Sequence, residues 1–230
     1  NLYTLYKEDY QKFIDYNIKD VQLVERIDEK MGLIELAMTI AYKGGCNYQE
    51  AFGTTQLWDT YIFRELCKRK TVVPTKRDNA KIDFGGGFVK TPQVGRHSWV
   101  VSFDLNSLYP HLIMQYNMSP ETIVSTRTTG VTVDNCLDMT APESKSPQDC
   151  MAANGVHFDK TQVGVLPSII DGLYSERKGI KRNMLNAQSE VEKGVVGAEK
   201  EITRLDTQQM AIKIMMNSLY GALGNRWFRY

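Results

Sequence analysis

Trp99-Val-Val-Ser-Phe-Asp-Leu-Asn-Ser-Leu-Tyr-Pro110 is the stretch that decides how this chain folds. Residues 99–104 are rich in β-forming side chains and end in a carboxylate. Residues 107–116 carry apolar side chains at helical spacing. The pattern predicts a short strand, a tight turn and a helix.

Asp104, at the end of the predicted strand, is the first candidate for chemistry. A carboxylate in this position can hold a divalent ion, and the backbone of the next turn can give a carbonyl to the metal and amides to a phosphate. Such a geometry suits phosphoryl transfer. The alternative is that Asp104 only caps the helix that follows, and the spacing alone leaves both possibilities open.

A helical hairpin is predicted downstream. Pro167 suits the first turn of a helix, and the sequence stays compatible with a helix to about Val191. Residues 194–197 offer a turn, and a second helix is predicted over residues 198–223. The two helices are expected to run antiparallel.

One face of the second helix combines four chemically distinct residues. Lys213, Asn217, Tyr220 and Gly221 fall at i, i+4, i+7 and i+8 and therefore share that face. A cation, an amide, an aromatic ring and a bare backbone suit a triphosphate at one end and a base at the other. The alternative is a solvated lysine beside a half-buried tyrosine.

The first helix of the hairpin carries a cluster of cations. Arg177 and Lys181 lie one turn apart, with Lys178 and Arg182 beside them. Arg and Lys form charge-assisted hydrogen bonds with phosphate oxygens, and a hairpin can swing them onto a substrate and away again. The alternative, a solvated basic face, applies above all to Lys178 and Arg182.

The N-terminal third is also expected to be helical. Apolar residues recur at helical spacing from residue 8 to residue 42, which predicts one long helix or two in tandem, closed by Gly44-Gly45. A further helix is expected over residues 55–70, with Thr54 or Thr55 as its N-cap. Its buried side is expected to consist of Leu57, Trp58, Tyr61, Ile62 and Leu66.

Tyr16 and Asp20 lie one turn apart in the first helical region. A phenol can orient a water molecule and a carboxylate can bind a metal for hydrolysis. The alternative is a buried tyrosine beside a surface aspartate. Residues 71–90 contain Pro74 and a Gly triplet and are interpreted as a linker, and residues 126–162 are expected to form loops with short strands.

Composition sets outer limits. The 230 residues are 42% hydrophobic and 24% charged, enough for a sizeable core or parts of two domains, and the formal net charge of +1 indicates no particular partner. The cysteines form no CxxC pair, which argues against zinc and fits a reducing compartment. No run of about 18 apolar residues is present to cross a membrane. The expected location is the cytoplasm.

Taken in this order, the segments are similar to family B DNA polymerases, most closely to the replicative enzymes of tailed bacteriophages. Residues 102–110 resemble motif A of the family, and Ser-Pro-Glu-Thr at residues 119–122 extends it in the phage manner. Lys213 together with Asn-Ser-Leu-Tyr-Gly-Ala-Leu-Gly at residues 217–224 resembles motif B. The resemblance covers most of the chain, and both motifs are highly specific.

The resemblance implies roles for the motif A residues. Asp104 binds two catalytic magnesium ions, and the carbonyl of Leu105 completes the coordination shell of one. The backbone around Ser107 and Leu108 cradles the phosphates. Tyr109 is the steric gate that leaves no room for a ribose 2′ hydroxyl and so selects dNTPs.

It also implies roles outside motif A. Arg177, Lys181, Lys213 and Asn217 grip the incoming triphosphate, and Tyr220 and Gly221 lie against the nascent base pair. Tyr16 and Asp20 belong to the third motif of a 3′→5′ exonuclease. Phe84-Gly85-Gly86-Gly87 stands where the family has a Tyr-x-Gly-Gly-like linker that touches template DNA, with Gly86 and Gly87 as the contacts. Phe84 in place of the usual tyrosine cannot donate a phenolic hydrogen bond.

The expected fold class is α+β, an incomplete right-hand polymerase with a partial palm sheet, a helical connector and a two-helix fingers hairpin. The expected division is residues 1–70 for the exonuclease C-terminal part and connector, 71–95 for a linker, 96–166 for the palm, 167–224 for the fingers and 225–230 for the return to the palm. Primer-template DNA and dNTPs are the implied partners, with a sliding clamp bound through other regions and no membrane. The location implied is the cytoplasm of a bacterial host.

An Asp-Thr-Asp motif that carries the second palm carboxylate in the family does not occur here, so the chain is expected to be a fragment that is inactive alone. One alternative is a non-catalytic subunit of a split polymerase that binds nucleic acid or nucleotide. A second is another nucleotidyl transferase, such as a primase or a reverse transcriptase. Motif A argues against pure binding, and Asn-Ser-Leu-Tyr-Gly after Lys213 argues against the second alternative.

Overall fold

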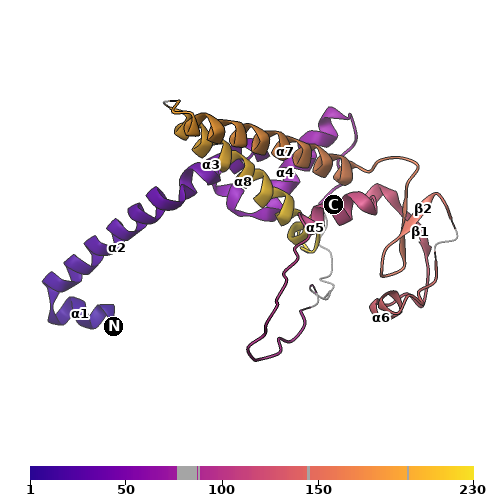
Figure 1. Cartoon of the computed structure of the whole chain (residues 1–230), viewed down its shortest axis with the longest axis horizontal. Coiled ribbons are helices and arrows are strands. Elements are labelled where there is room, and N and C mark those ends of the chain that lie inside the picture. Colours follow the sequence, from indigo (N-terminus) through magenta and orange to yellow (C-terminus); the bar gives the residue numbers. More distant parts are fainter. Residues whose placement is uncertain (77–86, 88, 144–145, 196) are drawn as a thin grey trace.

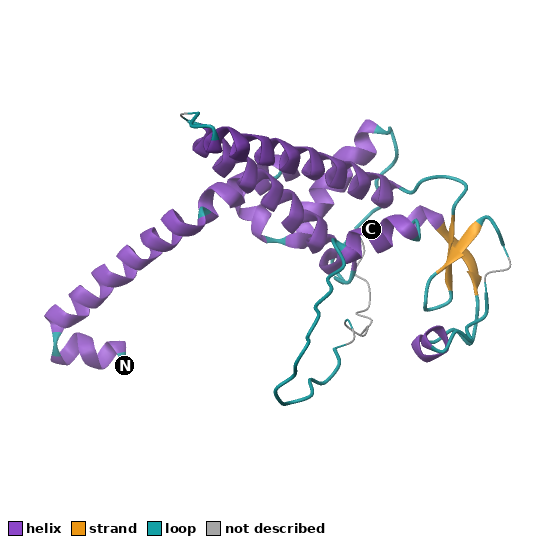
Figure 2. Ribbon diagram, viewed as in Figure 1, coloured by secondary structure: helices purple, strands orange, loops and turns teal. Residues whose placement is uncertain are grey.

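The computed structural model describes residues 1–76, 87, 89–143, 146–195 and 197–230. A helical body occupies the centre, an extended helical arm projects from it, and a small sheet lies on the opposite side (Figure 1). Helices dominate the described residues, and the strands are confined to that sheet (Figure 2). This helix-rich architecture with one small antiparallel sheet confirms the predicted α+β class.

The α-helices are α1 (Leu2–Glu8), α2 (Tyr10–Met31), α3 (Leu33–Gly44), α4 (Thr54–Lys68), α5 (Leu108–Gln115), α6 (Val133–Leu137), α7 (Val165–Glu192) and α8 (Ala198–Leu223). Two 3-10 helices are η1 (Tyr48–Phe52) and η2 (Pro120–Thr122), and the strands are β1 (Ile123–Arg127), β2 (Asp149–Met151) and β3 (Val156–Asp159). No helix in the described part of the chain is both long and apolar enough to span a membrane.

The core lies where α4 packs against the α7–α8 hairpin. Its principal buried side chains are Leu57, Trp58, Ile62, Leu66, Ile169, Ile170, Leu173, Ala211, Ile212, Met215, Met216 and Leu219. Trp58 is fully buried, and its indole N–H donates to the backbone oxygen of Met215 at 3.2 Å and to Oγ of Ser218 at 3.0 Å. Four of the five residues expected on the inner side of α4 are buried and Tyr61 is half-buried, which confirms that pattern.

The α7–α8 hairpin has the form that the sequence predicts. The two helices lie side by side in the body (Figure 1). Pro167 lies in the first turn of α7, where its missing N–H leaves no intrahelical bond unmade. Gly197 precedes α8 with φ of 92°, a backbone conformation that glycine adopts without steric cost.

The N-terminal helices form the projecting arm. Gly32, with φ of 59°, separates α2 from α3, and Gly45, with φ of 68°, ends α3. Of the two predicted possibilities, one long helix or two in tandem, the structure has two in tandem, closed by the glycine pair as expected. α2 buries none of its residues, whereas α3 buries Ala37, Ile40 and Ala41 against the body. The periodicity of α2 thus describes an amphipathic helix whose apolar face is uncovered among the described residues.

The sheet has the order β1-β3-β2 and is antiparallel throughout. Cys150 pairs with Phe158 across β2 and β3, while an irregularity interrupts the β1–β3 ladder between Ile123 and Arg127. β2 and β3 fall within residues 126–162, where loops with short strands are expected, whereas β1 begins before this range and the helix α6 lies inside it.

The strand predicted over residues 99–104 is wrong. These residues have no regular secondary structure, and no described strand pairs with them. Trp99 is 99% exposed and Phe103 is 92% exposed. A strand needs a neighbour to satisfy its backbone N–H and C=O groups, and a β-rich composition alone does not supply one.

The N-cap expected at Thr54 or Thr55 is also wrong. Thr54 is already the first residue of α4, and the N-cap is Gly53, whose backbone is extended (φ −101°, ψ 105°). The 3-10 helix η1 runs up to Gly53, so the chain changes direction there rather than one residue later.

Side chains from residues 117–121, which follow α5, accept hydrogen bonds from the backbone at the N-terminus of α7. Gly164 provides no side-chain cap, but the backbone N–H of Gly164 donates to Oδ1 of Asn117 at 2.9 Å, and that of Leu166 donates to Oγ of Ser119 at 3.3 Å. A carboxylate oxygen of Glu121 accepts from the N–H of Val165. Remote side chains therefore satisfy the unpaired donors of the helix end, where an anion is also favoured by the helix dipole.

Candidate functional site

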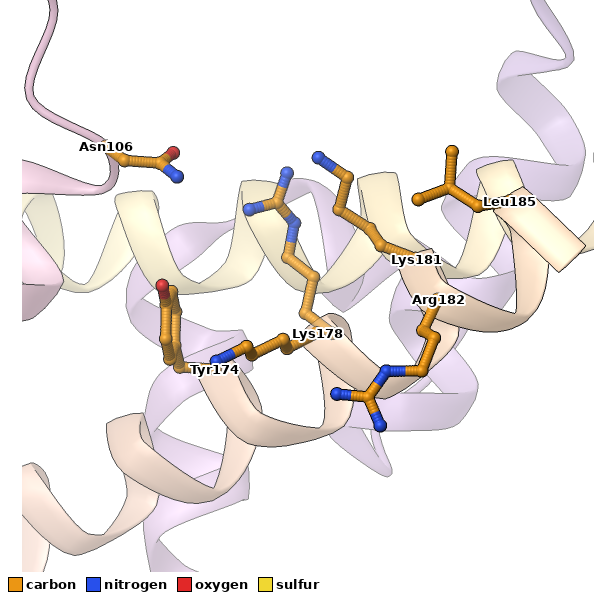
Figure 3. A pocket seen from close by; sticks show the side chains of 7 residues that line it. Asn106, Tyr174, Lys178, Lys181, Arg182 and Leu185 are labelled. Carbon is orange, nitrogen blue, oxygen red and sulfur yellow. The ribbon is translucent and has the colours of Figure 1, made fainter.

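A cavity of about 350 Å³ opens between α7 and the turn that precedes α5. Its lining residues are Asn106, Tyr174, Arg177, Lys178, Lys181, Arg182 and Leu185. In Figure 3 the side chain of Asn106 reaches from the turn toward the row of side chains on α7, and the amine of Lys181 points to the same side. The tertiary fold thus brings the region after Asp104 to the cations of the hairpin.

The cavity is strongly cationic. It is lined by four basic side chains and no carboxylate. Within the described residues, Lys178, Lys181 and Arg182 form no ion pair. Uncompensated cations around a concave surface attract a polyanion, and Arg and Lys bond phosphate oxygens with charge-assisted hydrogen bonds.

Arg177 is tied to the partner helix of the hairpin. Its Nε and Nη2 donate to Oε1 of Gln209 at 3.2 and 3.0 Å, and its Nε also lies 3.3 Å from the backbone oxygen of Gln209. Gln209 is 6% exposed, and its Nε2 donates to Oδ1 of Asp206 at 2.8 Å. The guanidinium is therefore held by a buried neutral amide rather than by a carboxylate.

Asp104 is exposed and forms no hydrogen bond or ion pair with any residue that the structure describes. The N-cap of α5 is Ser107, so the alternative in which Asp104 caps that helix is wrong. Leu105 is 70% exposed. Oxygen donors of this kind suit magnesium, which is commonly held by one or two carboxylates with water and substrate phosphates.

Ser107 adopts a left-handed backbone conformation, with φ of 55°. Its carbonyl oxygen lies 3.1 Å from the backbone nitrogen of His111 and 2.9 Å from Nδ1 of the same residue. Non-glycine residues in this region cost about 1–3 kcal/mol and gather at functional sites. The strained turn leads directly into Leu108 and Tyr109, the first two residues of α5.

Tyr109 reaches across to the second helix of the hairpin. Its ring stacks on that of Tyr220, with centroids 4.7 Å apart. A Cβ added at Gly87 would lie 3.4 Å from the hydroxyl of Tyr109, so the glycine backbone approaches the ring closely. Phe84, Gly85 and Gly86, the rest of the expected template-contacting segment, lie outside the described residues.

The predicted common face of α8 exists. Lys213, Asn217, Tyr220 and Gly221 are all exposed on it, while the opposite face is buried in the core. Of these residues, Tyr220 meets motif A through the stack with Tyr109. Lys213 and Asn217 do not line the cavity with Arg177 and Lys181, so the expected convergence of all four on one site is untested.

Tyr16 and Asp20 lie on α2 in the projecting arm, and both are exposed. The alternative of a buried Tyr16 is therefore wrong, since its side chain is 47% exposed. Among the described residues no group of three or more His, Cys, Asp or Glu side chains could hold a metal ion.

Several residues of the site carry no sequence signal of their own. Tyr174 lines the cavity and packs edge-on against His111, with ring centroids 4.8 Å apart. Asn106 and Gln209 are ordinary polar residues in the sequence. Only the packing of α5 and α8 against α7 brings them together.

Comparison with known sequences defines the class. The sequence model of DNA polymerase family B matches residues 52–227, a range that includes both motifs and the cationic cavity. The chain therefore belongs to DNA polymerase family B. The resemblance noted in the sequence is confirmed.

Particular relatives come from phages and archaea. The DNA-directed DNA polymerases of Escherichia phage RB69 and Enterobacteria phage T4 are each 32% identical to this chain over 98% of its length and 30% of their own. DNA polymerase 1 of Pyrococcus abyssi is 31% identical over 76% of the chain and 20% of its own length. The chain thus spans about 30% of the length of the phage relatives.

A solved structure shares the fold. The family B DNA polymerase of the hyperthermophilic archaeon Pyrobaculum calidifontis superposes with a TM-score of 0.70, covering 99% of this chain and 28% of the other at 22% identity. The likeness extends from the arm through the hairpin, so the arrangement of the described elements is that of a part of a family B polymerase.

Proposed function

We propose that this chain is the part of a DNA polymerase that binds the incoming dNTP and supplies one carboxylate to two-metal phosphoryl transfer. The reaction is the template-directed addition of a deoxynucleotide to a primer 3′ end. Since the chain spans about 30% of its phage relatives, the second metal-binding carboxylate is expected from residues outside this sequence.

The observation that carries the proposal is the cationic cavity. It joins the turn after Asp104, through Asn106, to four basic side chains of α7. A triphosphate needs several cations at one end and a metal-binding carboxylate near its α-phosphate. The cavity supplies the cations, and Asn106 in its lining is two residues from Asp104. Family membership makes nucleotide binding the use that fits these charges best.

Each residue then has a defined task. Arg177 and Lys181 bind the triphosphate in the cavity, and Lys213 and Asn217 join them when the hairpin moves toward the substrate. Tyr109 lies under the sugar and rejects a 2′ hydroxyl, and the backbone around Ser107 and Leu108 holds the phosphates. Tyr220 and Gly221 lie against the nascent base pair.

Magnesium supplies the remaining chemistry. Asp104 and Leu105 would hold magnesium, which would help to activate the primer hydroxyl and to stabilise the pyrophosphate that leaves. The exposed carboxylate of Asp104 and the carbonyl of Leu105 are oxygen donors that fit this ion, although the described residues contain no complete metal cluster. Asp104 and Leu105 therefore fit a magnesium site that substrate phosphates and a second carboxylate would complete.

The arm and the linker extend the proposal to DNA. Tyr16 and Asp20, which are both exposed on α2, are assigned to an associated 3′→5′ exonuclease of the full-length protein. Gly87, whose backbone lies close to the hydroxyl of Tyr109, is assigned to the contact with template DNA. A sliding clamp stays a prediction from the resemblance.

The test is primer extension with magnesium and dNTPs. The chain is assayed alone and joined to the segment of the phage RB69 relative that follows the matched region, which supplies the second carboxylate. Extension is expected only from the joined form, and Asp104→Ala is expected to abolish it. Lys200→Gln, a change at an exposed lysine on α8, serves as the matched control and is expected to leave extension unchanged.

The uncompensated cations of the cavity also suit a second function, since they can hold a polyanion without any chemistry. In that case the chain is a non-catalytic subunit that holds nucleic acid or nucleotide. Retained DNA binding by a folded joined form that never extends a primer would establish it and overturn the polymerase proposal.

A further inference from the structure

We propose that Gln209 is a positioning residue for Arg177, and that it fixes the guanidinium so that one edge of it is presented to the triphosphate. The inference rests on the proposed function, in which Arg177 binds that triphosphate. Gln209 then contributes to nucleotide binding by orienting Arg177, and Asp206 contributes by accepting a hydrogen bond from the amide of Gln209.

The geometry of the contact is specific. Oε1 of Gln209 lies 3.2 Å from Nε and 3.0 Å from Nη2 of Arg177, so one oxygen engages the whole Nε/Nη2 edge of the guanidinium. The backbone oxygen of the same residue lies 3.3 Å from Nε. Two acceptors on one residue therefore fix both the position and the rotation of the guanidinium plane.

The amide of Gln209 has one possible orientation. Arg177 can only donate hydrogen bonds and the carboxylate of Asp206 can only accept them. The amide oxygen must therefore face Arg177, and the amide nitrogen must face Asp206, to which it donates at 2.8 Å. Because Gln209 is only 6% exposed, a reversed amide would leave buried groups without partners at a cost of about 1–3 kcal/mol.

The contact leaves the phosphate-binding edge available. Nη1 of Arg177 has no hydrogen-bond partner among the described residues, and the outward N–H of Nη2 points the same way. This Nη1/Nη2 edge is the fork that binds two phosphate oxygens at once. Arg177 itself lines the cationic cavity, so the edge that Gln209 does not use belongs to that space.

A neutral amide is the side chain that such a role requires. A carboxylate at residue 209 would form an ion pair with Arg177 and weaken its attraction for a phosphate. An aliphatic side chain would leave the guanidinium free to rotate, and binding would have to order it at a cost of about 0.5–1.5 kcal/mol. The amide orders the cation and leaves its charge intact.

The experiment measures the affinity of the full chain for dATP with magnesium by calorimetry at one fixed salt concentration. Gln209→Leu is expected to raise the Kd about tenfold, and Gln209→Glu is expected to raise it at least as much. The double variant Arg177→Gln with Gln209→Leu is expected to bind no more weakly than Arg177→Gln alone. Gln208→Leu, at the adjacent glutamine, is the matched control and is expected to leave the Kd unchanged.

A second readout separates this inference from the proposed function. The Nε–H of Arg177 is observed by NMR, and its exchange with water is expected to speed up in Gln209→Leu while far-UV circular dichroism stays unchanged. If Arg177→Gln weakens dATP binding but Gln209→Leu does not, the positioning role is overturned. If Arg177→Gln leaves dATP binding unchanged, the nucleotide role of Arg177 fails and this inference fails with it, even where the NMR signal shows the contact to be real.

Discussion

The ring of Tyr109 stacks on the ring of Tyr220, with centroids 4.7 Å apart and planes 18° from parallel. Tyr109 lies in the first turn of α5 and Tyr220 near the end of α8, more than a hundred residues further along the chain. The contact joins the two sequence motifs directly.

Tyr109→Ala is expected to reduce the preference for dATP over ATP. Removing the ring opens the space that a 2′ hydroxyl needs, and a single steric contact of this kind changes selectivity by about 10–200-fold. The ratio of the two Kd values, measured with magnesium, is the readout. Tyr109→Phe keeps the ring and is expected to retain the preference. An unchanged ratio in Tyr109→Ala would refute the gate role.

Lys181→Gln is expected to weaken dATP binding about tenfold, since one charge-assisted hydrogen bond to a phosphate is lost. Lys200→Gln removes the same charge from an exposed position on α8 outside the cavity. The control is expected to change the Kd less than twofold. Equal effects of both changes would mean that net charge, rather than the cavity, attracts the nucleotide.

Trp58→Phe is expected to destabilise the chain by about 2–4 kcal/mol. The indole is fully buried and donates to the backbone oxygen of Met215 and to Oγ of Ser218, so the change removes both hydrogen bonds and opens a cavity. Urea unfolding followed by circular dichroism measures the loss. Trp227→Phe, at a side chain that is 50% exposed, is expected to cost less than about 1 kcal/mol.

Asn117→Ala is expected to destabilise the chain by about 2–4 kcal/mol. The buried amide donates to the backbone oxygens of Asp159 and Gln162 and accepts from the N–H of Gly164. The residue also has φ of 51°, a conformation that asparagine tolerates better than alanine. Thermal unfolding measures the effect, and Asn183→Ala on the exposed face of α7 is expected to leave the midpoint within about 1–2 °C.

Tyr230 is expected to make stability fall at alkaline pH. Burial, with a smaller contribution from Asp59, raises the pKa of Tyr230 to about 12, against an ordinary pKa of about 10 in the unfolded chain. The folded state therefore keeps this proton more tightly than the unfolded state does. The stabilisation is fully present below about pH 10 and is lost as the pH rises toward 12.

Urea midpoints at pH 9 and pH 11 test this expectation. Tyr230→Phe cannot ionise, so the drop between the two pH values is expected to be smaller than in the unaltered chain. Identical drops would show that the phenol of Tyr230 does not contribute. The same pair of proteins compared at pH 7 gives the effect of the hydroxyl itself.

Much of the helical fold follows from local patterns. The spacing of apolar residues predicted α4, α5, α7 and α8, and the glycines at residues 44–45 and 197 marked where helices end or begin. Such signals are readable because helix hydrogen bonds and caps lie within a few residues of one another. The family likewise follows from motif order, since both motifs lie within the matched range.

The predictions that were wrong concern features that depend on contacts between segments distant in the sequence. The run at residues 99–104 has β-forming side chains but no described strand beside it, and a sheet is a property of at least two segments. Tyr16 shows the same limit, because helical spacing predicted a face but could not say whether anything covers it. Asn106, Tyr174 and Gln209 reach the site only because helices distant in sequence pack together.

The sequence by itself determined the long helices, the glycines at which α3 ends and α8 begins, the residues that share a face of α8 and the polymerase family. The tertiary structure alone decided that Tyr109 stacks on Tyr220, that Asn106 completes the cationic cavity and that Gln209 holds Arg177. The physical reason is how far apart in the sequence the interacting residues lie. Helix periodicity and capping are local and leave a trace in neighbouring residues, whereas a contact between α7 and α8 or between α5 and α8 depends on how the buried faces of whole helices pack.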